Sequence, residues 1–201
     1  MEQSWAAAHS RSKPQAGQAP QRIFFGLWPS AATAEQTMAW AHDAHALCGG
    51  RVMRPETLHV TLAFLGSTPA ARVAELVRAV PGWQARTGAM TLRRFGRFTG
   101  PRIVWAGPTE DDEERLDWLD ALHDDLWSRL EEMGWTRPDA IFRPHVSLLR
   151  KAGPGDVQTW RRPPLAWMPD RCVLVASTPS EGGSRYQELA RLPISQAASQ
   201  R

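Results

Sequence analysis

The segment LHVTLAFLG at residues 58–66 and the segment PHVSLLR at residues 144–150 are two versions of one short pattern. Each copy has a histidine two residues before a hydroxyl residue, His59 before Thr61 and His145 before Ser147, with Val between them and Leu after them. Both copies lie in runs typical of strands, in which alternate residues point to the same face. Each copy is therefore predicted to place an imidazole beside a hydroxyl on one face, opposite apolar packing.

The duplication distinguishes these two histidines from the rest. A lone histidine two residues before a hydroxyl is typical of a hydrogen-bonded strand, and none of the remaining histidines has that spacing: His9, His42, His45 and His123. His42 and His45 lie one turn apart on a predicted helix, but no matching third metal ligand lies nearby. We predict a solvated helix face there, and neither a metal site nor a cofactor in this chain.

Two imidazoles fit one reaction class. Cleavage of a phosphodiester without a metal needs a base that activates water and an acid that protonates the leaving oxygen. Near neutral pH, imidazole serves in either protonation state. Two hydroxyls in the same cleft donate hydrogen bonds to the non-bridging oxygens, where charge must be stabilised. The pattern thus predicts catalytic roles for His59, His145, Thr61 and Ser147.

Helices and strands alternate around the two motifs. Ser30 is a predicted N-cap of a helix that ends at Leu47 before two glycines, and Thr68-Pro69 begins a second helix that ends near residues 81–82. The predicted strands pair up between helices, which indicates an α+β fold with antiparallel or mixed sheets. They cover residues 22–28, 58–66, 89–98, 102–106, 141–149, 171–177 and 184–190.

The charges are unevenly distributed. Residues 110–132 hold 11 of the 21 acidic residues, and within and just after this stretch leucines at steps of three and four, from Leu116 to Leu130, followed by Met133, predict one amphipathic helix. Outside residues 110–132 the chain carries 22 basic and 10 acidic residues, a field that attracts polyanions. Arginine, which dominates the basic residues, suits phosphate because its planar fork donates two parallel hydrogen bonds.

Composition limits the remaining possibilities. Residues 1–20 are predicted to be a disordered tail, residues 21–192 one bilobal domain, and residues 193–201 a flexible tail. No apolar run approaches the roughly 20 residues that cross a bilayer, and the N-terminus lacks the apolar region of a secretory signal. With only Cys48 and Cys172 in the chain, we expect a reduced, cytoplasmic protein that works as a monomer away from membranes.

The two motifs resemble the paired motifs of the 2H phosphoesterases. Within these, the chain is similar to the LigT-like RNA 2′,3′-cyclic phosphodiesterases, also called ThpR-type 2′–5′ RNA ligases. The similarity extends to Arg22-Ile23-Phe24-Phe25-Gly26-Leu27, to Arg102-Ile103-Val104-Trp105 and to Ser184-Arg185-Tyr186, and so covers about residues 21–192. Ser147 stands where the family often has Thr, and serine retains the donor.

The resemblance implies a bilobal, pseudo-symmetric fold. Two antiparallel sheets would face each other across a central cleft, with the helices outside, and each lobe would supply one motif. The implied reaction is hydrolysis of RNA 2′,3′-cyclic phosphate ends to 2′-phosphomonoesters, with His59 as proton donor and His145 as proton acceptor. The implied partners are RNA ends or nucleotides with that cyclic phosphate.

Five further residues are candidates for substrate binding. Arg143 has the same strand parity as His145, and Arg150 follows the second motif as it does in the family. Arg102 precedes an apolar strand. Phe64 and Trp105 are candidates for base stacking, because aromatic faces stack on unpaired bases.

Two other functions remain open from the sequence. Microscopic reversibility permits the joining of RNA ends through a 2′–5′ linkage, although water and the strained cyclic ester favour hydrolysis. An RNA-end binding module without catalysis is the other alternative, but a module that only binds has no need of a matched acid and base.

Overall fold

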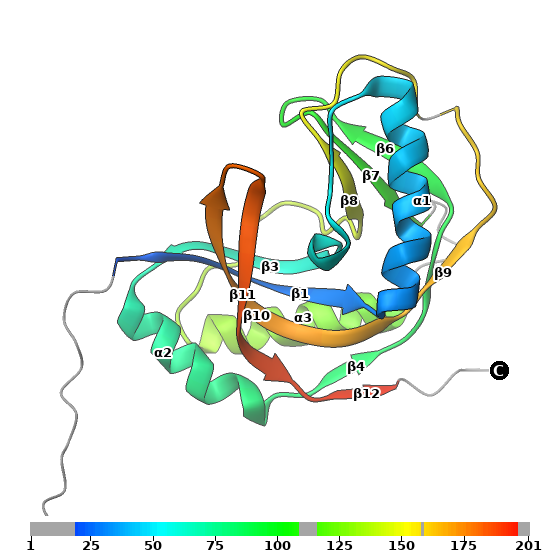
Figure 1. The fold of residues 1–201 in the computed structure, drawn as a ribbon. Coiled ribbons are helices and arrows are strands. Elements are labelled where there is room, and N and C mark those ends of the chain that lie inside the picture. Colours follow the sequence, from blue (N-terminus) through cyan, green and yellow to red (C-terminus); the bar gives the residue numbers. More distant parts are fainter. Residues whose placement is uncertain (1–18, 109–115, 158, 197–201) are drawn as a thin grey trace, which may run out of the picture.

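The structure, a computed structural model, describes residues 19–108, 116–157 and 159–196. It consists of two lobes, each built on an antiparallel sheet, with helices on the outside (Figure 1). The predicted tail at residues 1–20 lies almost wholly outside the described residues. No described helix has the length and apolar character needed to cross a membrane.

The first lobe contains four strands in the order β11-β10-β1-β3, each antiparallel to its neighbour. These strands are β1 (Gln21–Pro29), β3 (Val60–Thr68), β10 (Pro169–Ser180) and β11 (Gly183–Leu192). The central strand β1 is buried through most of its length because it lies between β10 and β3. The first lobe therefore joins strands from both ends of the chain.

The second lobe has the order β8-β7-β6, again antiparallel, and β2 pairs with the end of β8. These strands are β2 (Arg51–Val52), β6 (Arg94–Phe98), β7 (Ile103–Gly107) and β8 (Val146–Arg150). Two small separate sheets complete the fold, β5 (Met90–Leu92) with β9 (Leu165–Trp167), and β4 (Ala85–Thr87) with β12 (Ile194–Gln196).

One pair of residues joins the two halves of the sheet. Val60 of β3 faces Val146 of β8 in antiparallel register, and this is the only pair that connects these two strands among the described residues. The two predicted sheets are thus halves of one path of strands, which bends sharply at this point (Figure 1). We call the Val60–Val146 pair the seam.

Each long helix packs on the lobe opposite to the strand that precedes it. The helix α1 (Ala31–Cys48) follows β1 of the first lobe but contacts β8 and β2 of the second. The helix α3 (Asp117–Glu132) follows β7 of the second lobe but contacts β3 of the first. This exchange ties the lobes together through side-chain packing.

The predicted helices are confirmed. The side chain of Ser30 accepts a hydrogen bond from the Thr33 N–H at 3.2 Å, as expected of an N-cap. His42 and His45 are exposed on α1. The second helix, α2 (Ala70–Ala79), is followed by the 3₁₀ turn η2 (Val80–Gly82), and the leucine stripe of α3 is buried.

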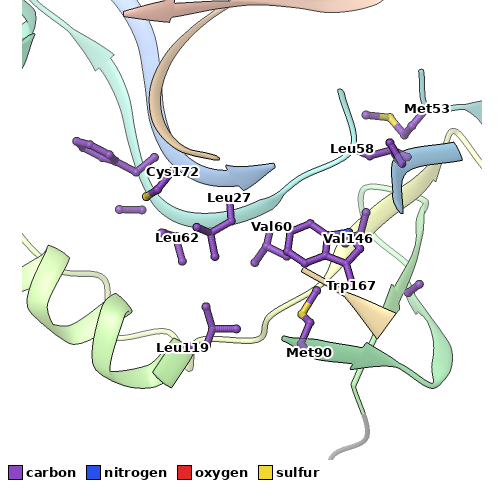
Figure 2. Packing of buried hydrophobic residues seen from close by; sticks show 14 of the residues in the cluster. Leu27, Met53, Leu58, Val60, Leu62, Met90, Leu119, Val146, Trp167 and Cys172 are labelled. Carbon is purple, nitrogen blue, oxygen red and sulfur yellow. The ribbon is translucent and has the colours of Figure 1, made fainter. Parts of the chain in front are cut away.

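Apolar residues beneath the seam form the main core. Val60, Leu62 and Val146 are at most 3% exposed, and Figure 2 shows them packed near Leu27 and Trp167. Full burial of one such aliphatic side chain stabilises the fold by about 1.5–3 kcal/mol. The apolar halves of both motifs therefore anchor the strands from which the histidines project.

Three predicted boundaries were wrong. β8 begins at Val146 and not at residue 141, because Pro144 has no N–H to donate and the Arg143 carbonyl bonds a side chain. The run 89–98 divides at Arg93 into β5 and β6, which pair with different strands. β12 lies within the predicted C-terminal tail because Ile194 packs on the core and pairs with Ala85.

Candidate active site

The seam places the four motif side chains on one face. Continued by one residue in each direction, the antiparallel register of Val60 and Val146 would place His59 opposite Ser147 and Thr61 opposite His145, although the pairing itself is confined to Val60 and Val146. Residues one step on either side of an inward-facing pair point to the opposite face, so all four side chains project away from the core. The charge of His145 acts on the ring of His59, so the two imidazoles lie near each other.

A backbone carbonyl orients the ring of His59. Its Nδ1 lies 2.7 Å from the carbonyl oxygen of Thr57, in the 3₁₀ turn η1 (Pro55–Thr57) just before β3. A carbonyl oxygen only accepts hydrogen bonds, so Nδ1 carries the hydrogen and Nε2 is the nitrogen left for a ligand.

Three aromatic rings enclose the same imidazole. Trp28 stacks on it at 4.7 Å with an interplanar angle of 18°, and Phe24 and Tyr186 lie at 5.0 and 5.4 Å. Gly26, between Phe24 and Trp28 on β1, makes room for this arrangement. A Cβ there would meet Trp28 at 3.0 Å, the Val60 carbonyl oxygen at 3.0 Å and the His59 ring at 3.4 Å.

His145 is held in a matching way. Its Nδ1 lies 2.7 Å from the carbonyl oxygen of Arg143, again two residues earlier in the chain. Two rings flank it, Phe98 at 4.9 Å edge to face and Trp105 at 6.0 Å. Gly96 leaves space for Trp105, since a Cβ at residue 96 would lie 1.9 Å from that indole.

Burial favours the neutral form of both histidines. Burial lowers the pKa of His59 from 6.5 to about 4, against the Thr57 carbonyl, which raises it, and the nearby His145 and Arg150 lower it further. Burial also lowers the pKa of His145, where the Arg143 carbonyl opposes the effect and Arg150 adds to it. The influence of Arg150 on both rings indicates that its positive charge lies near both.

Two neighbouring cavities open at the motifs. One, of about 220 Å³, is lined by His59, Thr61, Phe64, Arg150 and Tyr186 together with other residues. The other, of about 590 Å³, is lined by His145 and Arg143 and also by Thr61 and Phe64. Because Thr61 and Phe64 border both cavities, a ligand bound at the seam can extend into either cavity.

Four of the five predicted substrate-binding residues lie beside the motifs, and Arg102 does not. Arg150 and Arg143 line one cavity each, and Phe64, which is 50% exposed, borders both. Trp105 pairs with Ser147 in the sheet and flanks His145. Arg102 lies apart, exposed in the turn between β6 and β7 with a left-handed backbone at φ 51°, and it lines none of the cavities described here.

Apart from Trp105, the aromatic rings beside the two histidines were not predicted from the sequence. Phe24 and Trp28 share the cleft face of β1 by strand parity, and their alternation around Gly26 was the available signal. Tyr186 comes from β11 and Phe98 from β6, strands whose neighbours no local pattern reveals.

Known proteins with similar sequences and folds belong to one group. Residues 27–105 match the family model described as LigT like Phosphoesterase. The RNA 2′,3′-cyclic phosphodiesterase of Escherichia coli K12 is 28% identical to this chain over 179 residues, which is 88% of this chain and 98% of that protein. The protein of the same name from Thermotoga maritima is 28% identical over 70% of this chain and 78% of that protein. The crystal structure of E. coli LigT complexed with 3′-AMP superposes with a TM-score of 0.70 at 28% identity, covering 88% of this chain and 99% of that chain.

Proposed function

We propose that this chain, which belongs to the LigT-like phosphoesterases, hydrolyses RNA 2′,3′-cyclic phosphate ends to 2′-phosphomonoesters. One observation carries the proposal. Two histidines, each oriented by a carbonyl 2.7 Å from Nδ1, stand immediately before the two strands that pair at the seam. Such an arrangement presents two Nε2 atoms to one ligand from opposite sides.

In the proposed reaction the cyclic phosphate binds between the two imidazoles. His145 Nε2 removes a proton from a water molecule, whose oxygen attacks the phosphorus. The bond from phosphorus to the 3′-oxygen breaks, and His59 Nε2 protonates that oxygen. Thr61 and Ser147 donate hydrogen bonds to the non-bridging oxygens, and the side chains of the protein supply every proton transfer without a metal.

The donor role of His59 requires that its ring take up a proton from the solvent when the anionic substrate binds. With a pKa of about 4, the ring is almost wholly neutral at pH 7 in the free protein. An anionic phosphate close to the ring favours the charged imidazolium and so raises its pKa. The same anion offsets the positive charge of Arg150, which lowers the pKa of both rings when the site is empty.

The surrounding residues would hold the rest of the substrate. Arg150 and Arg143 would bind phosphate oxygens from their two cavities, and Phe64 and Trp105 would contact the base. Structures of E. coli LigT have been determined with 3′-AMP and with ATP, so that related protein binds nucleotides. We further propose that the enzyme acts as a monomer in the cytoplasm, where its two free, buried cysteines would stay reduced.

Turnover of a nucleoside 2′,3′-cyclic phosphate in the presence of EDTA tests this function. We expect a 2′-phosphomonoester as the only product, and loss of turnover in both His59→Ala and His145→Ala. His42→Ala, at an exposed histidine on α1, is the matched control and should keep full activity.

Three outcomes would contradict the proposal. Binding without turnover would indicate the RNA-end module, and a requirement for a divalent cation would indicate another mechanism. Joining of RNA ends at a higher rate than hydrolysis, at equal concentrations of RNA ends, would indicate a ligase.

A further inference from the structure

A third and separate cavity lies on the first lobe beside His59. It measures about 450 Å³, and its walls include Trp28, Tyr186, Val173, Val175, Arg171 and Arg185. Phe24, Trp28, Val173 and Val175 form a small apolar cluster of their own, against which Tyr186 packs. The cavity thus has an apolar floor, and its rim carries three arginines together with the two carboxylates Glu56 and Glu188.

Shared residues connect this cavity to the catalytic face. Tyr186 lines it and also the 220 Å³ cavity that contains His59. Arg54 and Tyr186 also line a narrow cavity of about 20 Å³ that extends to Arg150. Trp28 is both a wall of the third cavity and the ring stacked on His59. An RNA strand that extends from the phosphate site along the first lobe therefore enters the third cavity.

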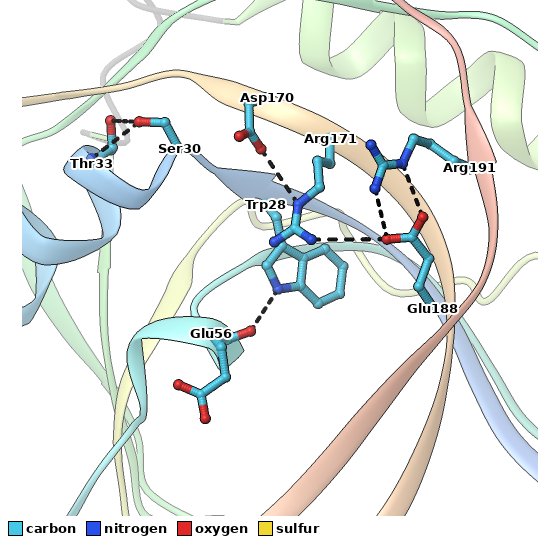
Figure 3. A network of polar contacts seen from close by, with 8 residues as sticks. All are labelled: Trp28, Ser30, Thr33, Glu56, Asp170, Arg171, Glu188 and Arg191. Carbon is cyan, nitrogen blue, oxygen red and sulfur yellow. Dashed lines mark hydrogen bonds and ion pairs between the residues drawn. The ribbon is translucent and has the colours of Figure 1, made fainter.

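Most of the rim arginines already have acidic partners. Arg54 pairs with Glu56 at 2.8 Å, and Arg171 lies 3.9 Å from Glu188, as Figure 3 shows for the second pair. Glu188 is held more tightly by Arg191, through two contacts of 2.9 and 3.1 Å. The carboxylates of the rim are therefore already neutralised by the protein.

Arg185 is the exception. Within the part of the chain that the structure describes, it is exposed and makes no side-chain hydrogen bond or ion pair. Arg51, Arg54 and Arg150 all lie near enough to Tyr186 for their charges to act on its hydroxyl group. The passage from the catalytic face to the third cavity is thus lined with positive charge that the protein itself only partly offsets.

We propose that this cavity binds the nucleotide that precedes the cyclic phosphate, so that the enzyme acts on oligoribonucleotide ends in preference to mononucleotides. The inference rests on the proposed function and adds its substrate class. A terminal cyclic phosphate closes the 3′ end of an RNA, so the chain continues only through the 5′-oxygen of the same ribose. The next base then stacks on Tyr186, which is partly exposed and lines both cavities, and Arg185 donates hydrogen bonds to the linking phosphate.

The test compares adenosine 2′,3′-cyclic phosphate with the dinucleotide ApA that ends in a 2′,3′-cyclic phosphate. We expect kcat/KM to be at least about 10-fold higher for the dinucleotide, since one stacked base contributes about 5-fold or more and one charged hydrogen bond about 10-fold or more. In Arg185→Ala the ratio of the two kcat/KM values should fall about 10-fold, while Arg185→Lys should retain part of the preference. Arg86→Ala, at an exposed arginine of β4, is the matched control and should leave the ratio unchanged.

The possible results distinguish a failure of this inference from a failure of the proposed function. A wild-type ratio near one, or a ratio that Arg185→Ala leaves unchanged, would overturn the inference while cyclic phosphate hydrolysis stands. An equal loss on both substrates in Arg185→Ala would also overturn it, because Arg185 would then act on the common step. Failure of the wild type to turn over either substrate would overturn the proposed function and the inference together.

Discussion

The His59 half and the His145 half of the cleft are built on the same plan but enclosed differently. Each has a strand that begins just after the histidine, a carbonyl 2.7 Å from Nδ1, and a glycine that leaves space for a large ring. His59 lies among three aromatic rings, one of them stacked at 4.7 Å, whereas His145 has two rings at its sides. A duplicated motif therefore fixes the position of two groups, and their surroundings set the proton affinity of each.

The largest expected effect tests whether both halves are equally necessary. His59→Ala and His145→Ala should each lower kcat by about 10²–10⁴-fold, since each removes one partner of an acid–base pair. The double variant should lose much less than the product of the two losses, because either one alone disables the pair. Single-turnover rates measure this, and multiplicative losses would show that the histidines act independently.

The hydroxyls are expected to matter less and to match each other. Thr61→Ala and Ser147→Ala should each lower kcat by about 10²-fold, the lower end of the range for one donor to a developing oxyanion. Thr61→Val keeps the shape of the side chain, so it should show the same loss. A change confined to KM would assign the hydroxyls to ground-state binding.

The difference in enclosure should be visible in the pH dependence of activity. kcat/KM reports the free protein, so we expect a bell-shaped profile with both limbs below the ordinary histidine pKa of 6.5. The apparent values belong to the coupled pair. The profile of kcat should lie at higher pH, because the bound anion raises the pKa of the rings. Identical profiles would contradict the uptake of a proton by His59 on substrate binding.

The same burial should make stability depend on pH. Between pH 6.5 and about 4 the unfolded chain binds a proton at His59 that the folded chain does not. The free energy of unfolding should therefore decrease as the pH decreases, by up to about 3 kcal/mol from this group. The full contribution of His59 to stability is present only above pH 6.5. Urea unfolding at pH 7 and pH 4.5 measures the loss, and His59→Gln should reduce it.

The two glycines allow a direct comparison of the halves. Gly96→Ala places a Cβ 1.9 Å from Trp105 and should destabilise the fold by about 1–3 kcal/mol, while Gly26→Ala, with contacts of 3.0 Å, should cost less. Gly100→Ala has no neighbouring atom within 4 Å and is the control. Thermal unfolding ranks the three variants, and an equal effect of all three would contradict the packing described at Trp105.

The smallest effect concerns Ser147. Ser147→Thr keeps the donor and adds a methyl beside Trp105, its partner in the sheet, so kcat should change by less than about threefold. A loss as large as that of Ser147→Ala would show that the wall of the His145 half leaves no space for a methyl.

Local patterns predicted much of this molecule. The repeated motif predicted which side chains share a face, and Ser30 and the leucines of α3 predicted two helices, because these features depend on residues close in the chain. The seam, the crossing of helices between lobes and the ring of Tyr186 beside His59 depend on strands far apart in the sequence. β8 begins at Val146 and not at residue 141 because the Arg143 carbonyl bonds the ring of His145, and no strand propensity reveals that bond.

The seam has a mechanical consequence. A single residue pair connects β3 to β8, so the backbone itself offers little resistance to a rocking motion of one lobe against the other. A phosphate bound by side chains of both lobes would restrict this motion. Occupancy of the site should then slow amide hydrogen exchange at Val60 and Val146 more than at the middle of either sheet.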